Sequence, residues 1–306
     1  MSKQRIFTVR DGQIDFSVRP GAQGQLVKDF QSAFNASSFV NQFEVIDVDG
    51  IWGPQTNKAV NLANDDDKKL MTIDTLNAVN MDAAFIIDVS DHQARIDFKG
   101  LASIGIRGAY YKLTEGFDWK AKRADRLHEA VDAGMLVGVY HFGRPDLHPR
   151  VEEARIERRN FEEEKKKLGI EFDLNDVYDL EKGNPDDKEH NTRYFTEFAQ
   201  GDIVDLYTAR FAVDAYCTSD IYRATLENNH NSNVWWAEYV REDPKGGPQK
   251  IPTLMTDCRI WQFTSKLLSG FTRKYDGEAS MIDCNLIWGD YSHKNKRRCS
   301  VDSASS

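Results

Sequence analysis

The pattern of hydrophobic and polar positions changes near residue 83. Between residues 21 and 80, apolar residues recur at spacings of three and four, which predicts amphipathic helices. Ahead of them, residues 5–18 alternate loosely around the turn dipeptide Asp11-Gly12, which predicts a short hairpin. We therefore expect residues 1–82 to form a small α-helical domain with an N-terminal hairpin.

Beyond residue 83 the pattern changes to short runs rich in apolar, β-branched and aromatic residues. There are eight of them: 85–90, 108–114, 136–142, 176–181, 203–208, 234–239, 259–264 and 281–287. Most carry apolar residues on both faces, as the strands of a buried parallel sheet do. Two connecting segments, 120–133 and 151–168, show a clear helical spacing, and each is followed by a glycine.

An alternation of strands and helices with eight strands predicts a closed barrel. We expect the α/β class, with a TIM-like β/α barrel of eight strands and about five helices over residues 83–292. The last three strands are joined by loops with little helical pattern, so the outer helical layer should be incomplete. Residues 293–306 are predicted to be a disordered tail.

Composition narrows the function classes. The net charge of −9 argues against a nucleic-acid partner, because phosphate binding needs a basic face. No stretch approaches the roughly 18 apolar residues that span a membrane, and no apolar run of signal-peptide length precedes the first charges. We expect synthesis in the cytoplasm and therefore free thiols at the four cysteines, Cys217, Cys258, Cys284 and Cys299. No cysteine or histidine spacing indicates a metal site.

The candidate chemistry lies in carboxylates at the ends of the predicted strands. In such barrels the reaction takes place at the carboxyl ends of the strands. The strand ends carry Asp88, Asp179, Glu181 and Asp283. Asp179 and Glu181 are two residues apart, so they should point to the same face of one strand, where repulsion and desolvation raise the pKa of one of them. A general acid needs this property.

Acids that converge near aromatic residues fit glycoside hydrolysis, because sugar rings stack on aromatic faces. The pattern alone leaves two alternatives open, a metal-dependent hydrolase and a protein without activity. We interpret His141 as a core or cleft-wall residue, because the carboxylates already supply acid and base. Glu115 and Glu238 also end strands, and we expect them to anchor loops or lie at the surface.

Seven segments together resemble glycoside hydrolase family 25, which comprises muramidases. In chain order they are Ile87-Asp-Val-Ser-Asp-His-Gln93, Tyr111-Lys-Leu-Thr-Glu-Gly116, Gly138-Val-Tyr-His-Phe142, Asp179-Leu-Glu181, Val234-Trp-Trp-Ala237, Trp261-Gln-Phe-Thr264 and Ile282-Asp-Cys-Asn285. Each segment is weak alone, but seven in the family's order are specific. The resemblance implies a barrel with eight strands and five helices, in agreement with the pattern.

The resemblance also implies a reaction, the hydrolysis of the β-1,4 bond between N-acetylmuramic acid and N-acetylglucosamine with retention. It makes Glu181 the general acid/base and Asp179 the nucleophile or the carboxylate that orients the acetamido group. Asp88 and Asp283 would line the cleft and complete the catalytic set. The sugar would contact four further residues, Tyr140, Tyr207, Trp235 and Gln262. No cofactor and no metal are expected.

The N-terminal segment resembles a small three-helix peptidoglycan-binding domain, through 27–34 and the turn Asp49-Gly-Ile-Trp-Gly-Pro-Gln-Thr56. A wall-binding module beside a wall-cleaving barrel raises the effective substrate concentration. We therefore expect a monomeric endolysin of phage type with peptidoglycan as its partner. It would accumulate in the host cytoplasm and act at the cell wall after release. The alternative is a catalytically inactive wall-binding or phage structural protein.

Overall fold

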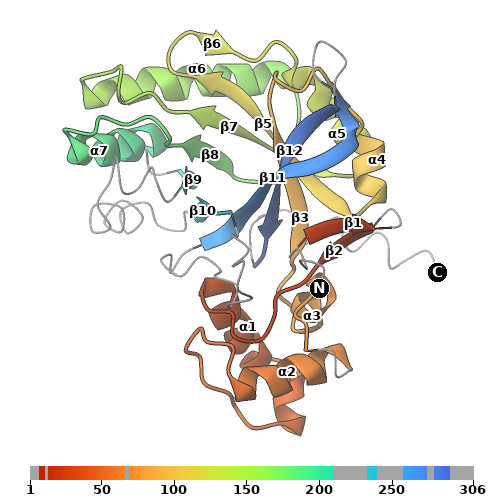
Figure 1. Cartoon of the computed structure of the whole chain (residues 1–306). Helices are drawn as coiled ribbons and strands as arrows, with labels where there is room; N and C mark the ends of the chain where they lie inside the picture. The colour runs from red at the N-terminus through yellow and green to blue at the C-terminus, as the bar shows by residue number, and fades with distance from the viewer. Residues whose placement is uncertain are drawn as a thin grey trace.

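The computed structural model describes residues 7–10, 13–65, 69–200, 202–209, 233–239, 258–273 and 279–289. They form a β/α barrel and a smaller helical unit at the end of the barrel where its first strand begins (Figure 1). The predicted disordered tail, 293–306, lies outside the described residues, as do Cys217 and Cys299. Cys258 and Cys284 are buried free thiols, as expected.

The N-terminal unit contains the predicted hairpin and helices. Its elements are β1 (Phe7–Arg10), β2 (Gln13–Phe16), α1 (Gln25–Ala36), the 3-10 helix η1 (Ser38–Gln42), α2 (Pro54–Asn64) and α3 (Ile73–Ala78). The strands β1 and β2 pair antiparallel. Leu26, Phe30 and Phe34 of α1 are fully buried, which confirms the helical spacing. Pro54 occupies the first turn of α2, where its missing N–H costs no hydrogen bond.

Eight strands close the barrel. They are β3 (Ala84–Val89), β5 (Ile106–Glu115), β7 (Leu136–Phe142), β8 (Asp176–Asp179), β9 (Val204–Ala209), β10 (Val234–Ala237), β11 (Cys258–Arg273) and β12 (Ala279–Ile287). Each strand pairs with the next in this order, β10 pairs with β11, and β12 returns to β3. All eight overlap the predicted runs, although β8 ends at Asp179, so Glu181 lies beyond the strand on which it was expected, and β11 continues to Arg273. Two short strands, β4 (Arg95–Ile96) and β6 (Trp119–Lys120), add to β11 and β5.

The sheet is mixed, which differs from the parallel sheet that the apolar runs suggested. The last strand, β12, runs antiparallel to both of its neighbours, β11 and β3, while the other neighbouring pairs of the barrel are parallel. A parallel strand needs a crossover of a dozen or more residues, and the connection from β11 to β12 spans only residues 274–278. So few residues cannot make that crossover, which accounts for the antiparallel pairing of β12 with β11.

Helices cover the outside of the barrel. They are α4 (Phe98–Ser103), α5 (Leu127–Asp132), α6 (Ala154–Leu168) and α7 (Lys188–Ala199), with 3-10 turns η2 (Ala124–Arg126) and η3 (Val151–Glu153). The helix predicted over 151–168 is present, and Gly169 ends it in the left-handed conformation at φ 62°. The helix predicted over 120–133 is shorter, because residues 119–120 pair with the end of β5.

Side chains alternate between the barrel interior and the layer under the helices. Ile86, Tyr110, Val177 and Trp235 belong to the interior cluster. Their neighbours in sequence pack outward with the helices. Gly138 faces the interior, where a Cβ would lie 2.4 Å from the ring of Tyr110 on the neighbouring strand, so only glycine leaves room for this ring.

The N-terminal unit docks on the barrel at the end where β11 begins and β12 ends. The Asp29 carboxylate of α1 accepts hydrogen bonds from Arg259 Nη1 at 2.7 Å and from Trp288 Nε1 at 2.8 Å. Phe16 packs on the rings of Phe85 and Phe263, with centroids at 5.5 and 5.6 Å. The two units thus share one apolar core, and the division at residues 82 and 83 stays a prediction.

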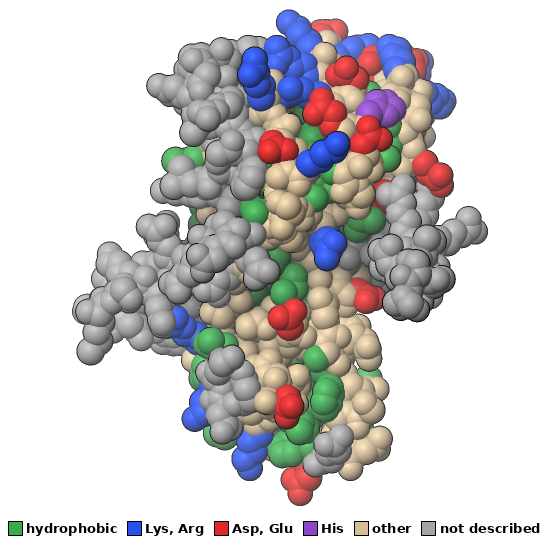
Figure 2. Space-filling view, turned by 90° about the vertical axis from the view of Figure 1, so that its right-hand side faces the viewer, with side chains coloured by type: hydrophobic (Ala, Val, Ile, Leu, Met, Phe, Trp, Pro, Cys, Tyr) green, Lys and Arg blue, Asp and Glu red, His purple; other side chains and the backbone are tan. Residues whose placement is uncertain are grey.

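Acidic and basic side chains are interspersed on the face of the barrel that Figure 2 shows. Within the described ranges, no helix is both long and apolar enough to cross a membrane.

Candidate active site

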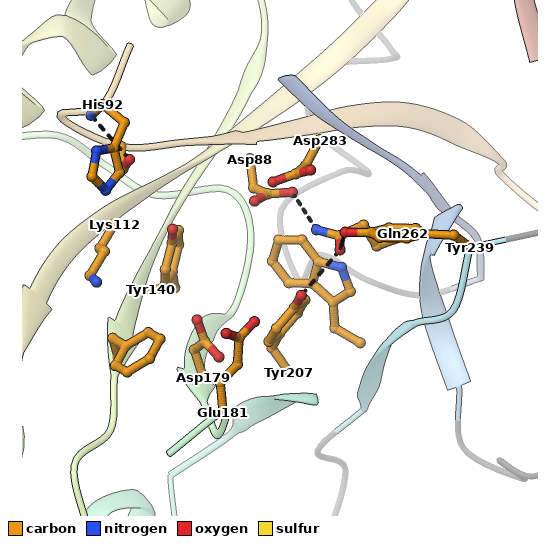
Figure 3. A pocket seen from close by; sticks show the side chains of 13 residues that line it. Asp88, His92, Lys112, Tyr140, Asp179, Glu181, Tyr207, Tyr239, Gln262 and Asp283 are labelled. Atoms are coloured by element: carbon orange, nitrogen blue, oxygen red, sulfur yellow. Dashed lines mark hydrogen bonds between the residues drawn. The ribbon is translucent and has the colours of Figure 1, made fainter. Parts of the chain in front are cut away.

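Inward-facing side chains near one end of the strands form a pocket (Figure 3). Its lining comprises Asp88, Ser90, His92, Lys112, Tyr140, Phe142, Asp179, Glu181, Tyr207, Trp235, Tyr239, Gln262 and Asp283. Successive side chains of a strand point alternately into and out of the barrel, which explains why these residues share the pocket. The inward side chains at the mouth are polar or aromatic, and those one layer deeper are apolar. The pocket therefore combines four carboxylates with aromatic walls.

Asp179 is the last residue of β8, and Glu181 lies two residues beyond it. Their carboxylates lie side by side in Figure 3. Asp179 is only 6% exposed, and its Oδ1 has no hydrogen-bond partner among the described residues. Burial and the Glu181 charge raise the pKa of Asp179 well above its usual value. Burial also raises the pKa of Glu181, against the opposing effects of a hydrogen bond with Tyr207 and the Lys112 charge.

Asp88 and Asp283 form a second pair, opposite each other on β3 and β12. Asp88 Oδ2 accepts hydrogen bonds from Asn285 Nδ2 at 2.9 Å and from Gln262 Nε2 at 3.1 Å. Burial raises the pKa of Asp88 to about 6, although both hydrogen bonds lower it. Burial and then the Asp88 and Glu181 charges raise the pKa of Asp283 to about 8. The pair therefore holds one proton near neutral pH.

Asp283 reaches the pocket from a strand whose direction differs from the expected one. The sequence predicts an eighth parallel strand with Asp283 at the end that faces the pocket. The antiparallel direction of β12 instead brings the first half of this strand to the pocket, and Asp283 pairs with Asp88. The expected side chain was right, and the expected strand direction was wrong.

Aromatic and amide side chains from β9, β10 and β11 line another wall of the pocket. The hydroxyls of Tyr207 and Tyr239 each lie 3.1 Å from Gln262 Oε1. Tyr207 and Trp235 pack edge to face with ring centroids 5.1 Å apart. Tyr140 lies to one side of the two pairs of acids in Figure 3, next to Lys112. The aromatic rings of such a wall can stack on a sugar, and its polar groups can bind the sugar hydroxyls.

Lys112 lines the pocket, and its charge lowers the pKa of Asp179. Its Nζ lies 2.6 Å from Glu115 Oε2 and 4.2 Å from the centroid of the Phe142 ring. Arg144 binds the other oxygen of Glu115 at 3.0 Å. Glu115 therefore anchors the rim and does not line the pocket, which agrees with the loop-anchoring interpretation.

His141 faces away from the pocket, toward α6. It is fully buried, and it bonds Thr114 Oγ1 at 2.8 Å and Glu157 Oε2 at 2.6 Å. This confirms its interpretation as a core residue. Trp236 also packs outward, and its Nε1 donates to Glu238 at 3.1 Å.

The structure brings all eight predicted site residues into this pocket, and their roles stay predictions. Five further residues line the pocket without a predicted catalytic or sugar-binding role, namely Ser90, His92, Lys112, Phe142 and Tyr239. Asn285, beneath the pocket, has no predicted role either. Ser90 and Asn285 could have been predicted, because they lie two residues beyond Asp88 and Asp283 and therefore point to the same face of the strand. In the described part of the chain, no group of three His, Cys, Asp or Glu side chains is arranged to hold a metal ion.

Comparisons with known proteins place the chain in a family. The family model described as glycosyl hydrolases family 25 matches residues 87–270, which is more than half of the chain. Lysozyme M1 of Streptomyces globisporus is 41% identical over 61 residues. That match covers 20% of this chain and 21% of that protein, so the chain spans about a fifth of the length of the curated relative.

Two solved structures share the fold. The Clostridium perfringens spore cortex lytic enzyme SleM has a TM-score of 0.53 at 21% identity, over 69% of this chain and 68% of that one. The CTP1L endolysin has a TM-score of 0.51 at 22% identity, over 67% of this chain and 66% of that one. The matched segment holds Asp88, Asp179 and Glu181, and the barrel agrees with these structures. The chain belongs to glycosyl hydrolases family 25.

Proposed function

We propose that the protein is a lysozyme-type muramidase that hydrolyses the β-1,4 bond between N-acetylmuramic acid and N-acetylglucosamine in bacterial peptidoglycan. The observation that carries the proposal is the pair of adjacent carboxyls, Asp179 and Glu181, whose pKa values are both raised. An acid that keeps its proton near neutral pH is what protonation of a glycosidic oxygen requires. Family membership and the partial match to Lysozyme M1 support the choice of substrate.

Glu181 is the general acid/base of the proposed reaction. It donates a proton to the leaving glycosidic oxygen and later takes one from the attacking water. Asp179 either attacks the anomeric carbon or orients the substrate acetamido group as an internal nucleophile. Its buried Oδ1 supports both roles, because a substrate atom is the partner that this oxygen lacks.

The remaining pocket residues bind and polarise the sugar. Asp88 and Asp283 contribute one negative charge and one proton next to the reacting carbon. Tyr140, Tyr207 and Trp235 form the aromatic wall on which the sugar rings stack, and the two tyrosine hydroxyls and the Gln262 amide hydrogen-bond the sugar.

The N-terminal unit is proposed to bind the cell wall, and the whole chain to act as an endolysin. Its loop 44–51 exposes Val45, Val48 and Ile51, which are 70%, 41% and 46% accessible. The CTP1L protein of the same fold is an endolysin. On this proposal the chain accumulates in the host cytoplasm, so cells that express it stay intact until their membrane is permeabilised and then lyse.

Purified peptidoglycan tests the enzyme proposal. Digestion should clear a suspension of sacculi, and mass spectrometry of borohydride-reduced products should show new reducing ends on muramic acid. New reducing ends on glucosamine would assign a different bond. Binding to sacculi without any new reducing end would instead favour the alternative, an inactive wall-binding or phage structural protein.

Glu181→Gln should lower the rate by a factor of about 10² to 10⁴, because an amide cannot supply the proton. Wall binding and folding should stay near those of the wild type. Glu163→Gln, at an exposed position of α6, is the matched control and should keep full activity. A Glu181→Gln variant that retained more than about a tenth of the wild-type rate would contradict the assignment of the general acid.

A further inference from the structure

Asn285 lies beneath the pocket, fully buried, and connects two residues that line it. Its Nδ2 donates to Asp88 Oδ2 at 2.9 Å, and its Oδ1 accepts from Trp235 Nε1 at 2.8 Å. It faces the barrel interior from β12, two residues beyond Asp283. Trp235 reaches it from β10, with β11 between the two strands.

This connection has only one orientation. An indole N–H donates and never accepts, so the oxygen of the Asn285 amide must face Trp235. Its NH₂ group must then face Asp88. Gln262 is less constrained, because the tyrosine hydroxyls near its Oε1 can both donate and accept.

The orientation determines the role of Asp88. Its Oδ2 receives two N–H groups, at 2.9 and 3.1 Å, so this oxygen is an acceptor and a proton on Asp88 would have to lie on Oδ1. Asp283 stands opposite Asp88 in the strand register, and a hydrogen bond between the two carboxyls favours the ionised Asp88 and the protonated Asp283. Two adjacent buried carboxyls cannot both ionise at neutral pH.

We propose that Asn285, oriented by Trp235, is a positioning residue that keeps Asp88 ionised and leaves the shared proton on Asp283. The inference rests on the proposed glycosidase function of this pocket. It gives the site a fixed negative charge at Asp88, which stabilises the positive charge that develops on the sugar. It also gives the site a neutral hydrogen-bond donor at Asp283.

Other titratable groups face Asp88 and contribute to its charge state. The carboxyls are Asp179 and Glu181 near β8, besides Asp283, and the phenols are Tyr140 on β7, Tyr207 on β9 and Tyr239 after β10. Lys112 on β5 contributes a positive charge, and the imidazole of His92 after β3 also lines the pocket. The Cys284 thiol of β12 lies near Asp88, and burial raises its pKa. Asn285 differs from all of these groups because it donates directly to Asp88 and does not titrate.

The test is the titration of Asp88 in the full-length protein, followed by ¹³C NMR of carboxyl-labelled aspartate. Asn285→Leu removes the donor, so the pKa of Asp88 should rise by about one unit. The acid limb of the kcat/KM profile on peptidoglycan should move up by the same amount, and kcat should fall more than KM changes. Asp88→Asn identifies the resonance.

Two further variants separate positioning from structure. Trp235→Phe leaves Asn285 in place but frees its amide to rotate, so the same shift should appear with a smaller size. This variant also keeps an aromatic ring in the barrel, which preserves the test if Asn285→Leu does not fold. Asn191→Leu is the matched control, because Asn191 is equally buried but bonds Asn184 beside α7. It should lower stability and leave the titration unchanged.

The outcomes distinguish the two proposals. An unchanged Asp88 titration in both Asn285→Leu and Trp235→Phe overturns the positioning role, whether or not the wild type is active. A shifted titration in a protein that hydrolyses no peptidoglycan supports the positioning role and overturns the proposed function. A shifted titration with a shifted acid limb supports both.

Discussion

At the scale of single residues, the pocket concentrates carboxyls that are costly to ionise. Asp88 and Asp283 have pKa values of about 6 and about 8, and that of Asp179 is raised as well. Asp205, at the other end of the barrel, is fully buried and has a pKa of about 7, although Asn175 and Asn233 donate to it. A functional pocket of this kind lowers the stability of the fold at alkaline pH.

The stability of the protein should therefore fall as pH rises. A carboxyl whose pKa is higher in the folded state stabilises the fold below its unfolded pKa of about 4, and this contribution is lost as pH rises through the folded value. For Asp283 the loss falls between about pH 4 and pH 8. Asp283→Asn cannot ionise, so we expect its free energy of unfolding at pH 9 to exceed that of the wild type by about 1–3 kcal/mol.

Urea unfolding at pH 5 and pH 9 measures this difference. Asp125→Asn, at an exposed position of η2, is the matched control and should follow the wild type at both values. Parallel pH dependence of Asp283→Asn and the wild type would mean that Asp283 is already ionised in the folded protein.

At the scale of elements, the loop 44–51 shows how buried polar groups hold a surface in place. Gln31 of α1 donates to Asp49 Oδ1 at 2.9 Å and accepts from the Gly50 N–H at 2.8 Å. Asn35, one turn further on, forms two hydrogen bonds with the backbone of Ile46. These hydrogen bonds hold both halves of the loop in place. Little conformational entropy is therefore lost when its exposed apolar side chains bind a ligand.

Ile51→Asp should therefore weaken binding to intact sacculi several-fold, because it places a charge in the exposed apolar group of this loop. Hydrolysis of short soluble fragments should stay unchanged. Co-sedimentation with sacculi and product release from the fragments give the two measurements. Ser32→Asp adds the same charge at an exposed position of α1 and should leave both unaffected. An Ile51→Asp variant that binds sacculi like the wild type would remove this loop from the wall-binding surface.

At the scale of the whole molecule, the pocket and the N-terminal unit lie at opposite ends of the barrel. Asp29 contacts Arg259 at the start of β11 and Trp288 just after β12. The pocket takes Asp88 from the far end of β3 and Asp283 from the first half of β12. Because the two units share one hydrophobic core, the N-terminal unit contributes to the stability of the barrel. Removing the unit would expose apolar barrel residues such as Phe85, so point variants test its role better than deletion does.

Asp29→Ala should lower the free energy of unfolding by about 1–3 kcal/mol, because it leaves the Trp288 indole N–H without its acceptor and the Arg259 guanidinium without its carboxylate partner. Asp29→Asn keeps one acceptor oxygen and should lose less. Calorimetry and tryptophan fluorescence should show one transition for the wild type, since the two units share a core. Two separate wild-type transitions would contradict this coupling.

The sequence by itself determined the helices and strands and the carboxylates that line the pocket. The period of two in the strands and of three to four in the helices follows from local geometry, so all eight strands and the helix over 151–168 were predictable. The adjacency of Asp179 and Glu181 is equally local. Only the tertiary structure decided the direction of β12, because the predicted runs 259–264 and 281–287 leave enough residues between them for a parallel crossover, whereas β11 in fact continues to Arg273 and leaves only residues 274–278. It also decided the Trp235–Asn285–Asp88 connection, because hydrogen bonds between strands far apart in sequence exist only once the barrel closes.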